Sequence, residues 1–130
     1  INDLSQRGVS MLVVGKNTGQ KINNKLKNFV QVPLFRLIEM IKYKAELAGI
    51  TFIQVEESYT SGTSFLDNEL PTKTFYNKER RKFRGLFISN GLKRINADVN
   101  ASFQIMKKVY EKFTYDSSVK YANPIVKTIC

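Results

Sequence analysis

Asp98 is the residue of this sequence whose setting most suggests chemistry, because it stands between Asn96 and Asn100 directly before a helical pattern. Apolar residues recur at spacings of three and four as far as Phe113, which predicts a helix over about 98–113. Asn96 or Asp98 is the natural N-cap of that helix. The positive end of the helix macrodipole favours an ionised carboxylate in the first turn. Asp98 therefore has the charge that a ligand of a hard divalent cation needs, although the simpler interpretation is a capping aspartate.

Two further acids, Glu56 and Glu57, follow a run of apolar and β-branched residues at 50–55. Acids at the carboxyl end of a parallel strand lie where open α/β sheets bind their ligands. If Asp98 faces the same edge, these acids can share a divalent metal, and two such ions about 4 Å apart are a standard arrangement for phosphodiester hydrolysis. Alternation along the strand does not decide between Glu56 and Glu57, because both faces carry apolar residues. At least one of the two is expected to be a solvated charge.

The elements that must position these acids form a strand–helix–strand unit. The apolar runs at 10–14 and 50–55 predict two strands that are buried on both faces. Between them, residues 33–48 have helical spacing, with Pro33 suited to the first turn and Gly49 to the stop. Because the connections are short, the two strands are expected to pair in parallel, which predicts the α/β fold class.

The remaining segments are predicted from local signals. Residues 16–28 are expected to be a polar loop, and residues 1–8 the end of a helix closed by a glycine. The Asn-Gly pair at 90–91 lies between the short apolar stretches 86–89 and 92–95, which predicts a β-hairpin.

The composition limits the chemistry and indicates a partner. The chain has no histidine, and its one cysteine is the last residue, Cys130. Ser/His/Asp and Cys/His triads, an internal disulfide and a cysteine-based zinc site are therefore excluded. A net charge of +10 suits a polyanion. Residues 71–94 hold eight lysines and arginines, one acid and four interleaved aromatic residues, the mixture that a phosphate-tracking and base-stacking surface uses. The alternative is a solvated basic surface.

No apolar run approaches the roughly 20 residues that span a bilayer. The sequence therefore predicts a soluble, cytoplasmic protein without a membrane partner.

Three motifs resemble a known family. The sequence Tyr-Thr-Ser-Gly-Thr at 59–63 follows a strand, and Asn-Ala-Asp-Val-Asn-Ala at 96–101 follows the basic segment. Tyr-Lys-Ala-Glu at 43–46 lies in the predicted helix. Together they resemble the C-terminal half of the TnpB (OrfB) family of transposon-encoded, RNA-guided nucleases, relatives of the type V CRISPR effectors. The resemblance covers about residues 10–110.

This resemblance implies a partial RNase H-like (RuvC) fold, with parallel strands, flanking helices and a β-hairpin insertion. The nuclease part is expected at 1–57 and 96–115, the inserted basic segment at 58–95 and a tail at 116–130. The family has a zinc ribbon in the insertion, but Ser64 stands where its first cysteine would be. The insertion is therefore expected to bind no zinc and to be ordered by the hairpin and by apolar packing.

The resemblance also assigns roles to the acids. Of the three acids that the family uses, only the one in the Asn-Ala-Asp motif maps onto this sequence, at Asp98. Gly15 stands where the family has a strand-end glutamate, so Glu57, or else Glu56, is expected to be a relocated catalytic acid and metal ligand. The implied cofactor of the intact nuclease is Mg²⁺ or Mn²⁺. Because the first-strand aspartate is missing, the chain is expected to be part of a longer protein and inactive alone.

The implied partners are DNA and a guide RNA, with the target read by base pairing. Backbone contacts are expected from Ser61, Thr63, Lys73, Arg80, Arg81, Lys82 and Arg84. Two alternatives remain open, a non-catalytic DNA- or RNA-binding module and an inactive relic. The sequence leaves the oligomeric state undecided.

Overall fold

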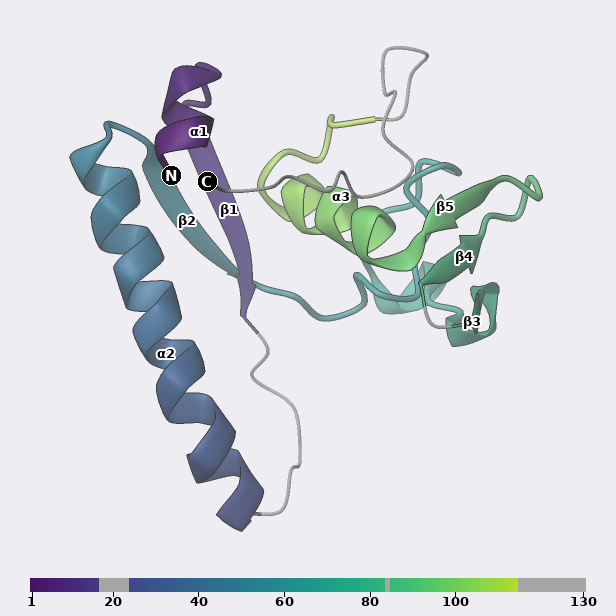
Figure 1. The fold of residues 1–130 in the computed structure, drawn as a ribbon. Coiled ribbons are helices and arrows are strands. Elements are labelled where there is room, and N and C mark those ends of the chain that lie inside the picture. The colour runs from purple at the N-terminus through teal and green to yellow at the C-terminus, as the bar shows by residue number, and fades with distance from the viewer. Residues whose placement is uncertain (17–23, 84, 115–130) are drawn as a thin grey trace. The chain divides into compact units, whose positions relative to one another are not determined.

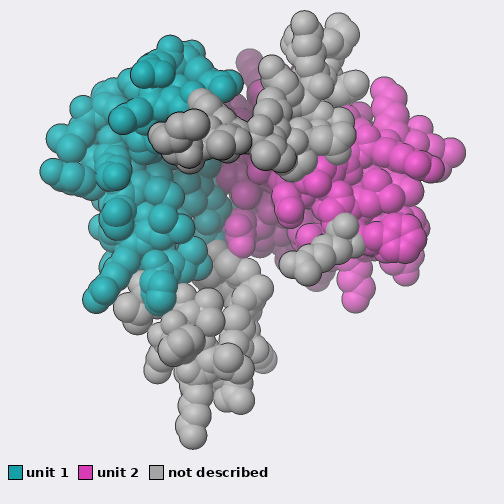
Figure 2. All heavy atoms as spheres, in the orientation of Figure 1, with its two compact units in different colours: residues 1–56 teal, residues 57–130 magenta. Residues whose placement is uncertain are grey.

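The fold divides into two compact units, Ile1–Glu56 and Glu57–Cys130 (Figure 2). The computed structural model describes residues 1–16, 24–83 and 85–114. None of the described helices is long and apolar enough to cross a membrane. The predicted tail at 116–130 lies outside the described residues. The division of the nuclease part into 1–57 and 96–115 stays a prediction.

The first unit is the predicted strand–helix–strand arrangement (Figure 1). It contains α1 (Asn2–Gln6), β1 (Met11–Lys16), α2 (Asn24–Leu47) and β2 (Thr51–Glu56). β1 and β2 pair in parallel, from Met11 beside Thr51 to Lys16 beside Glu56. The predicted strands and their parallel pairing are confirmed.

α2 starts earlier than predicted. It begins at Asn24 and contains Pro33 in its interior, so the predicted loop at 16–28 is wrong for residues 24–28. It is also wrong for Lys16, which ends β1, and residues 17–23 lie outside the described residues. Residues such as Lys25 and Leu26 are good helix formers, and one missing N–H at Pro33 does not end the helix. The predicted stop is confirmed. Gly49 has a positive φ of 75°, and the N–H of Ile50 donates to the carbonyl of Ala45, as in a Schellman motif.

The strands of the first unit are only partly buried, so the prediction that both of their faces are covered is wrong. No residue of β1 or β2 is fully buried. The described sheet of this unit has two strands, which gives a single thin layer under α2. Ala45 and Ile50 are its buried apolar residues among those described.

The second unit contains an antiparallel sheet and a helix (Figure 1). The strands are β3 (Arg81–Phe83), β4 (Leu86–Ile88) and β5 (Arg94–Asn96), in the order β3-β4-β5. Two short 3₁₀ turns, η1 (Lys73–Phe75) and η2 (Lys78–Arg80), precede them. The fold is therefore mixed α/β, with one parallel and one antiparallel sheet.

The predicted hairpin is confirmed as β4–β5, but its turn differs from the predicted one. The backbone N–H of Ser89 donates to the carbonyl of Lys93, which encloses a longer loop than an Asn-Gly pair. The left-handed residue of the loop is Leu92, at φ 61°. A third strand, β3, joins this hairpin and was not predicted.

α3 (Ala97–Val109) follows β5 directly. Asn96 is its N-cap, because Asn96 Oδ1 accepts hydrogen bonds from the N–H groups of Asp98 and Val99. The helix ends four residues before the predicted limit of 113. Its apolar side packs on a small core, made by Phe87, Ile95, Ala97, Leu66, Val99 and Phe103.

Candidate nucleic-acid interface

The loop after β2 is held by polar side chains on the buried face of α3. Asn100 Nδ2 donates to the carbonyl of Thr63 (2.8 Å), and Asn100 Oδ1 accepts the N–H of Phe65 (3.0 Å). Gln104 Nε2 donates to Thr63 Oγ1 (2.8 Å) and to the carbonyl of Glu69 (3.0 Å). Sequence reasoning missed these anchors. The sequence signal for these anchors was the polar side chains at 100, 104 and 107, whose spacing places them on one face of the helix.

Arg80 is the centre of the second unit's polar interior. Its guanidinium makes a two-pronged ion pair with Glu69, at 2.7 Å from Oε1 and 2.8 Å from Oε2. It also donates to the carbonyls of Gly62 (2.8 Å) and Phe75 (2.9 Å) and to Asn90 Oδ1 (3.2 Å). Arg80 and Glu69 are each 7% exposed. Arg80 is one of the residues predicted to contact the nucleic-acid backbone. Its guanidinium here binds groups inside its own unit instead.

Asp67 joins the same loop to the hairpin. Its carboxylate accepts the N–H groups of Asn90 (2.7 Å) and Gly91 (3.3 Å). Ser64, the residue in the expected cysteine position, donates its backbone N–H to Glu69 Oε2 (2.7 Å). Carboxylates and one arginine thus connect the loop after β2 to the β4–β5 hairpin.

Asp98 lies in the first turn of α3, and 80% of its side chain is exposed. Asn96 supplies the cap, so the Asp98 carboxylate is not used for it. Its Oδ1 is 3.7 Å from Nη2 of Arg81. The carboxylate is therefore accessible to a ligand, with one arginine beside it.

The described contacts do not bring Glu57 to Asp98. Ser58, the next residue after Glu57, accepts a hydrogen bond from Lys108 Nζ (3.1 Å) in the last turn of α3. Asp98 and Lys108 are ten residues apart, which is about 15 Å along the helix axis. Glu56 belongs to β2 in the other unit. The relocated acid stays a prediction.

No group of three or more acidic, histidine or cysteine side chains able to hold a metal ion occurs among residues 1–16, 24–83 and 85–114. Magnesium can be bound by one or two carboxylates with water and phosphate oxygens. Asp98 is suited to be one of these carboxylate ligands, because its hard oxygen atoms lie at an exposed position.

The exposed surface of the second unit is basic and aromatic. Lys73, Lys78, Arg81 and Lys82 are exposed, as is Ser61, whereas Thr63 is fully buried. Arg84 lies outside the described residues. Exposed aromatic side chains accompany these cations, at Tyr59, Phe75, Tyr76 and Phe83.

Lys107 is a buried amine on the same face of α3 as Asn100 and Gln104. It is 1% exposed, and its Nζ has no hydrogen-bond partner. The amine lies 5.9 Å from the ring centre of Phe65. Burial lowers the pKa of Lys107, while the negative charge of Glu69 acts in the opposite direction.

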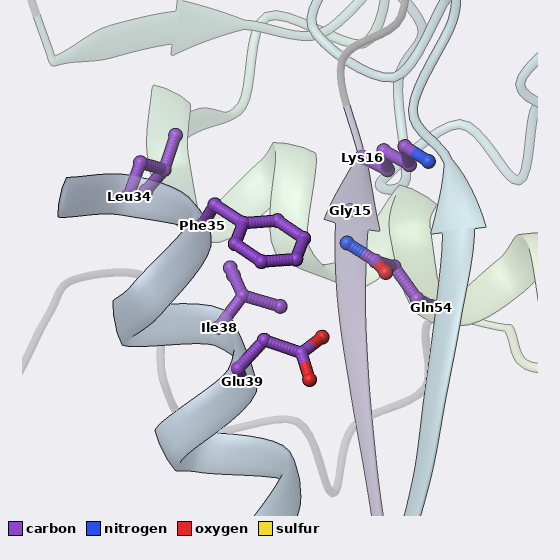
Figure 3. A pocket seen from close by; sticks show the side chains of 7 residues that line it. All are labelled: Gly15, Lys16, Leu34, Phe35, Ile38, Glu39 and Gln54. Atoms are coloured by element: carbon purple, nitrogen blue, oxygen red, sulfur yellow. The ribbon is translucent and has the colours of Figure 1, made fainter. Parts of the chain in front are cut away.

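The first unit has a half-open groove of about 330 Å³ between α2 and the sheet (Figure 3). In Figure 3, Phe35 and Glu39 point from α2 toward β1, and the Gln54 amide faces them. The groove is lined by Gly15, Lys16, Leu34, Phe35, Ile38, Glu39 and Gln54. The lining of this groove thus includes both Gly15 and the carboxylate of Glu39, an acid that sequence reasoning did not consider.

Comparison with known proteins gives one family. The family model described as Cas12f1-like, TNB domain matches residues 35–105, which is more than half of the chain. The match runs from α2 through β2 and the antiparallel sheet into α3. No curated protein matches the chain.

Proposed function

Since this chain belongs to the Cas12f1-like, TNB domain family, which is of the TnpB/Cas12 type, we propose that it binds nucleic acid as part of an RNA-guided DNA endonuclease. The observation that carries the proposal is the division of basic residues in the second unit. Arg80 is buried and holds the loops together, while Lys73, Lys78, Arg81 and Lys82 are exposed. A fixed scaffold therefore presents cations to the phosphate backbone.

Binding by such a surface is driven by the release of counterions from the strand. Four phosphate contacts on a single strand give a slope of about −3 in a plot of log K against log salt. The net charge of +10 adds a long-range attraction that accelerates the encounter. In this proposal the sequence of the target is read by a guide RNA and not by these side chains.

The test is the salt dependence of binding between the 130-residue chain and a labelled DNA or RNA strand. Removing two cations, in Lys78→Ala/Lys82→Ala, reduces the slope by about 1.4, because each phosphate contact contributes about 0.7. The matched control is Lys42→Ala/Lys44→Ala, which removes two exposed lysines from α2 in the first unit. If the two double variants reduce the salt slope equally, this contradicts a nucleic-acid-binding surface on the second unit. Weak binding that does not saturate favours the inactive relic.

Catalysis is a second proposal for the same family. Asp98 is the metal ligand in it, supported by its exposed position in the first turn of α3 and by the family's use of this acid. Glu57, or else Glu56, would supply the second carboxylate. Bound Mg²⁺ or Mn²⁺ would supply an activated water for phosphodiester hydrolysis. The RuvC-like arrangement of the nuclease domain and a zinc-free insertion belong to this proposal.

The two proposals are separated by adding Mg²⁺ or Mn²⁺ to the chain with labelled DNA. We expect salt-sensitive binding without cleavage, since one of the family's three acids has no counterpart in the sequence. Cleavage that is lost in Asp98→Asn would instead make the isolated chain an enzyme. Cleavage that survives both Glu56→Gln and Glu57→Gln would reject the relocated acid.

A further inference from the structure

Two tyrosines form an exposed aromatic pair on the second unit. The ring centres of Tyr59 and Tyr76 lie 5.6 Å apart, with an angle of 70° between the ring planes. Tyr59 is 39% exposed and Tyr76 is 41% exposed. The two rings therefore make an edge-to-face corner that leaves much of each side chain open to solvent.

The backbone around the pair is built to hold this corner. Gly62 lies against Tyr76 so closely that an added Cβ would be 2.6 Å from ring carbon Cδ2. The carbonyl of Gly62 accepts the N–H of Asn77, the neighbour of Tyr76 (2.9 Å). These two contacts fix the segment that carries Tyr76 against the loop that carries Tyr59.

Tyr59 itself has a left-handed backbone, at φ 64°, which is uncommon for a bulky residue. Its carbonyl accepts a hydrogen bond from Thr63 Oγ1 (2.7 Å), and Thr63 is fully buried against α3. The strained conformation is thus imposed by the polar anchors of the loop. Strain of this kind concentrates at functional sites, and here its result is a tyrosine ring left at the surface.

Lysines lie near each tyrosine or its neighbour in the chain. Lys73 and Lys78 are exposed on either side of Tyr76 in the sequence. Lys108 brings its amine to Ser58, the residue before Tyr59. A partner held by the two rings would therefore meet positive charge close by, which favours a negatively charged polymer with flat groups.

We propose that the Tyr59–Tyr76 corner stacks an unpaired base of a single-stranded nucleic acid, while the neighbouring lysines contact its phosphates. This inference rests on the proposed function and deepens it, because it names the strand type and the side chains that hold a base. A duplex is disfavoured, since its bases already stack on one another. An apolar protein segment is the rival occupant, and it gives no reason for the cations.

The first experiment compares two 12-nucleotide strands of equal charge, oligothymidine and its abasic analogue. We expect the chain to bind the thymidine strand at least about fivefold more tightly, the lower end of what one base stacked on an aromatic side chain contributes. Tyr59→Leu/Tyr76→Leu should bring the two affinities to within about twofold of each other, since the stacking contribution is removed. Tyr76→Phe should keep the preference, because it keeps the ring.

The matched control is Tyr43→Leu, which removes an exposed tyrosine from α2 in the first unit. It should leave the preference for bases unchanged. Salt-sensitive binding of the abasic strand reports the proposed function separately. If that strand binds but bases add nothing, or the double variant keeps the preference, the stacking site is wrong and the proposed function stands. If neither strand binds, both the stacking site and the proposed function are wrong.

A second measurement does not depend on a variant that folds. Irradiation of the wild-type chain with a strand containing 5-iodouracil links the base to an aromatic side chain on which it stacks. We expect the crosslinked peptides to carry Tyr59 or Tyr76. Crosslinks that map only to other aromatic residues would overturn the inference.

Discussion

Replacing Arg80 by methionine is the sharpest test of how the second unit is held together. The substitution keeps an unbranched side chain of similar length but removes the guanidinium. Glu69 then remains buried, with the Ser64 N–H and the Asn90 amide as its hydrogen-bond donors. The carbonyl of Gly62 loses the guanidinium as a donor at the same time.

The structure sets the size of the effect. Removing one partner of a buried ion pair costs about 3–5 kcal/mol, because the other charge is left uncompensated. Arg80 and Glu69 are both nearly inaccessible to solvent, so this range applies and not the small value of a surface pair. A small domain has a stability of only about 5–15 kcal/mol. Arg80→Met should therefore bring the second unit close to unfolding.

Hydrogen exchange measured by mass spectrometry can read this effect in one unit of the chain. Peptides covering β4 and β5 report the second unit, and peptides covering β1 and β2 report the first. At a factor of ten for each 1.4 kcal/mol, exchange in β4 and β5 should accelerate roughly 100-fold to several thousand-fold. Exchange in β1 and β2 should not change.

A double variant separates the ion pair from simple packing. Arg80→Met/Glu69→Leu removes both charges and should be more stable than Arg80→Met alone, because the Glu69 carboxylate no longer remains buried without its guanidinium partner. Arg80→Lys keeps the charge but not the planar fork and should lie between wild type and Arg80→Met. Two outcomes would show that the buried Arg80–Glu69 ion pair does not hold the second unit together. One is an acceleration of exchange by less than about tenfold in Arg80→Met, and the other is a double variant that is the least stable of the three variants.

Three further predictions follow from single features. Because burial lowers the pKa of Lys107, the unfolded chain binds more protons than the folded chain between that pKa and the ordinary lysine value. The stability of the second unit should therefore rise with pH in this interval. Lys107→Met should remove this rise and increase the urea midpoint of unfolding at pH 7. A lower midpoint in this variant would contradict the prediction. Asn96→Ala should lower the stability of the second unit by about 1 kcal/mol, since it removes the cap of α3, and an unchanged thermal midpoint would reject the cap. EDTA should leave the β4–β5 hairpin intact, because Asp67 joins its loop through backbone N–H groups; loss of the hairpin signals in NMR would show a structural metal.

Local signals were enough to predict much of the fold. Gly49 could be predicted as the end of α2 because only the backbone conformation of one residue decides it. Asn96 could be predicted as a cap of α3 because its bonds reach only two and three residues along the chain. Pro33 misled the prediction of where α2 starts, since proline inside a helix is disfavoured but not forbidden.

The polar interior could not be predicted, because its partners are far apart in the sequence. Arg80 reads as one more cation in a basic segment, and only the fold brings it to Glu69 and to the carbonyl of Gly62. Asn100 lies 35 and 37 residues from its two partners. The same limit applies to Asp98, whose motif predicts a metal ligand without supplying the positions of the other ligands.

The polar stripe on α3 has a thermal consequence. Unfolding the second unit exposes Asn100, Gln104 and Lys107 together with the Arg80–Glu69 pair. Exposure of apolar surface raises the heat capacity of unfolding, and exposure of polar surface lowers it. The heat capacity change for each residue of this unit should therefore be below the usual value. Its free energy would then vary little between cold and warm conditions, so the geometry of its surface would be preserved over a wide range of growth temperatures.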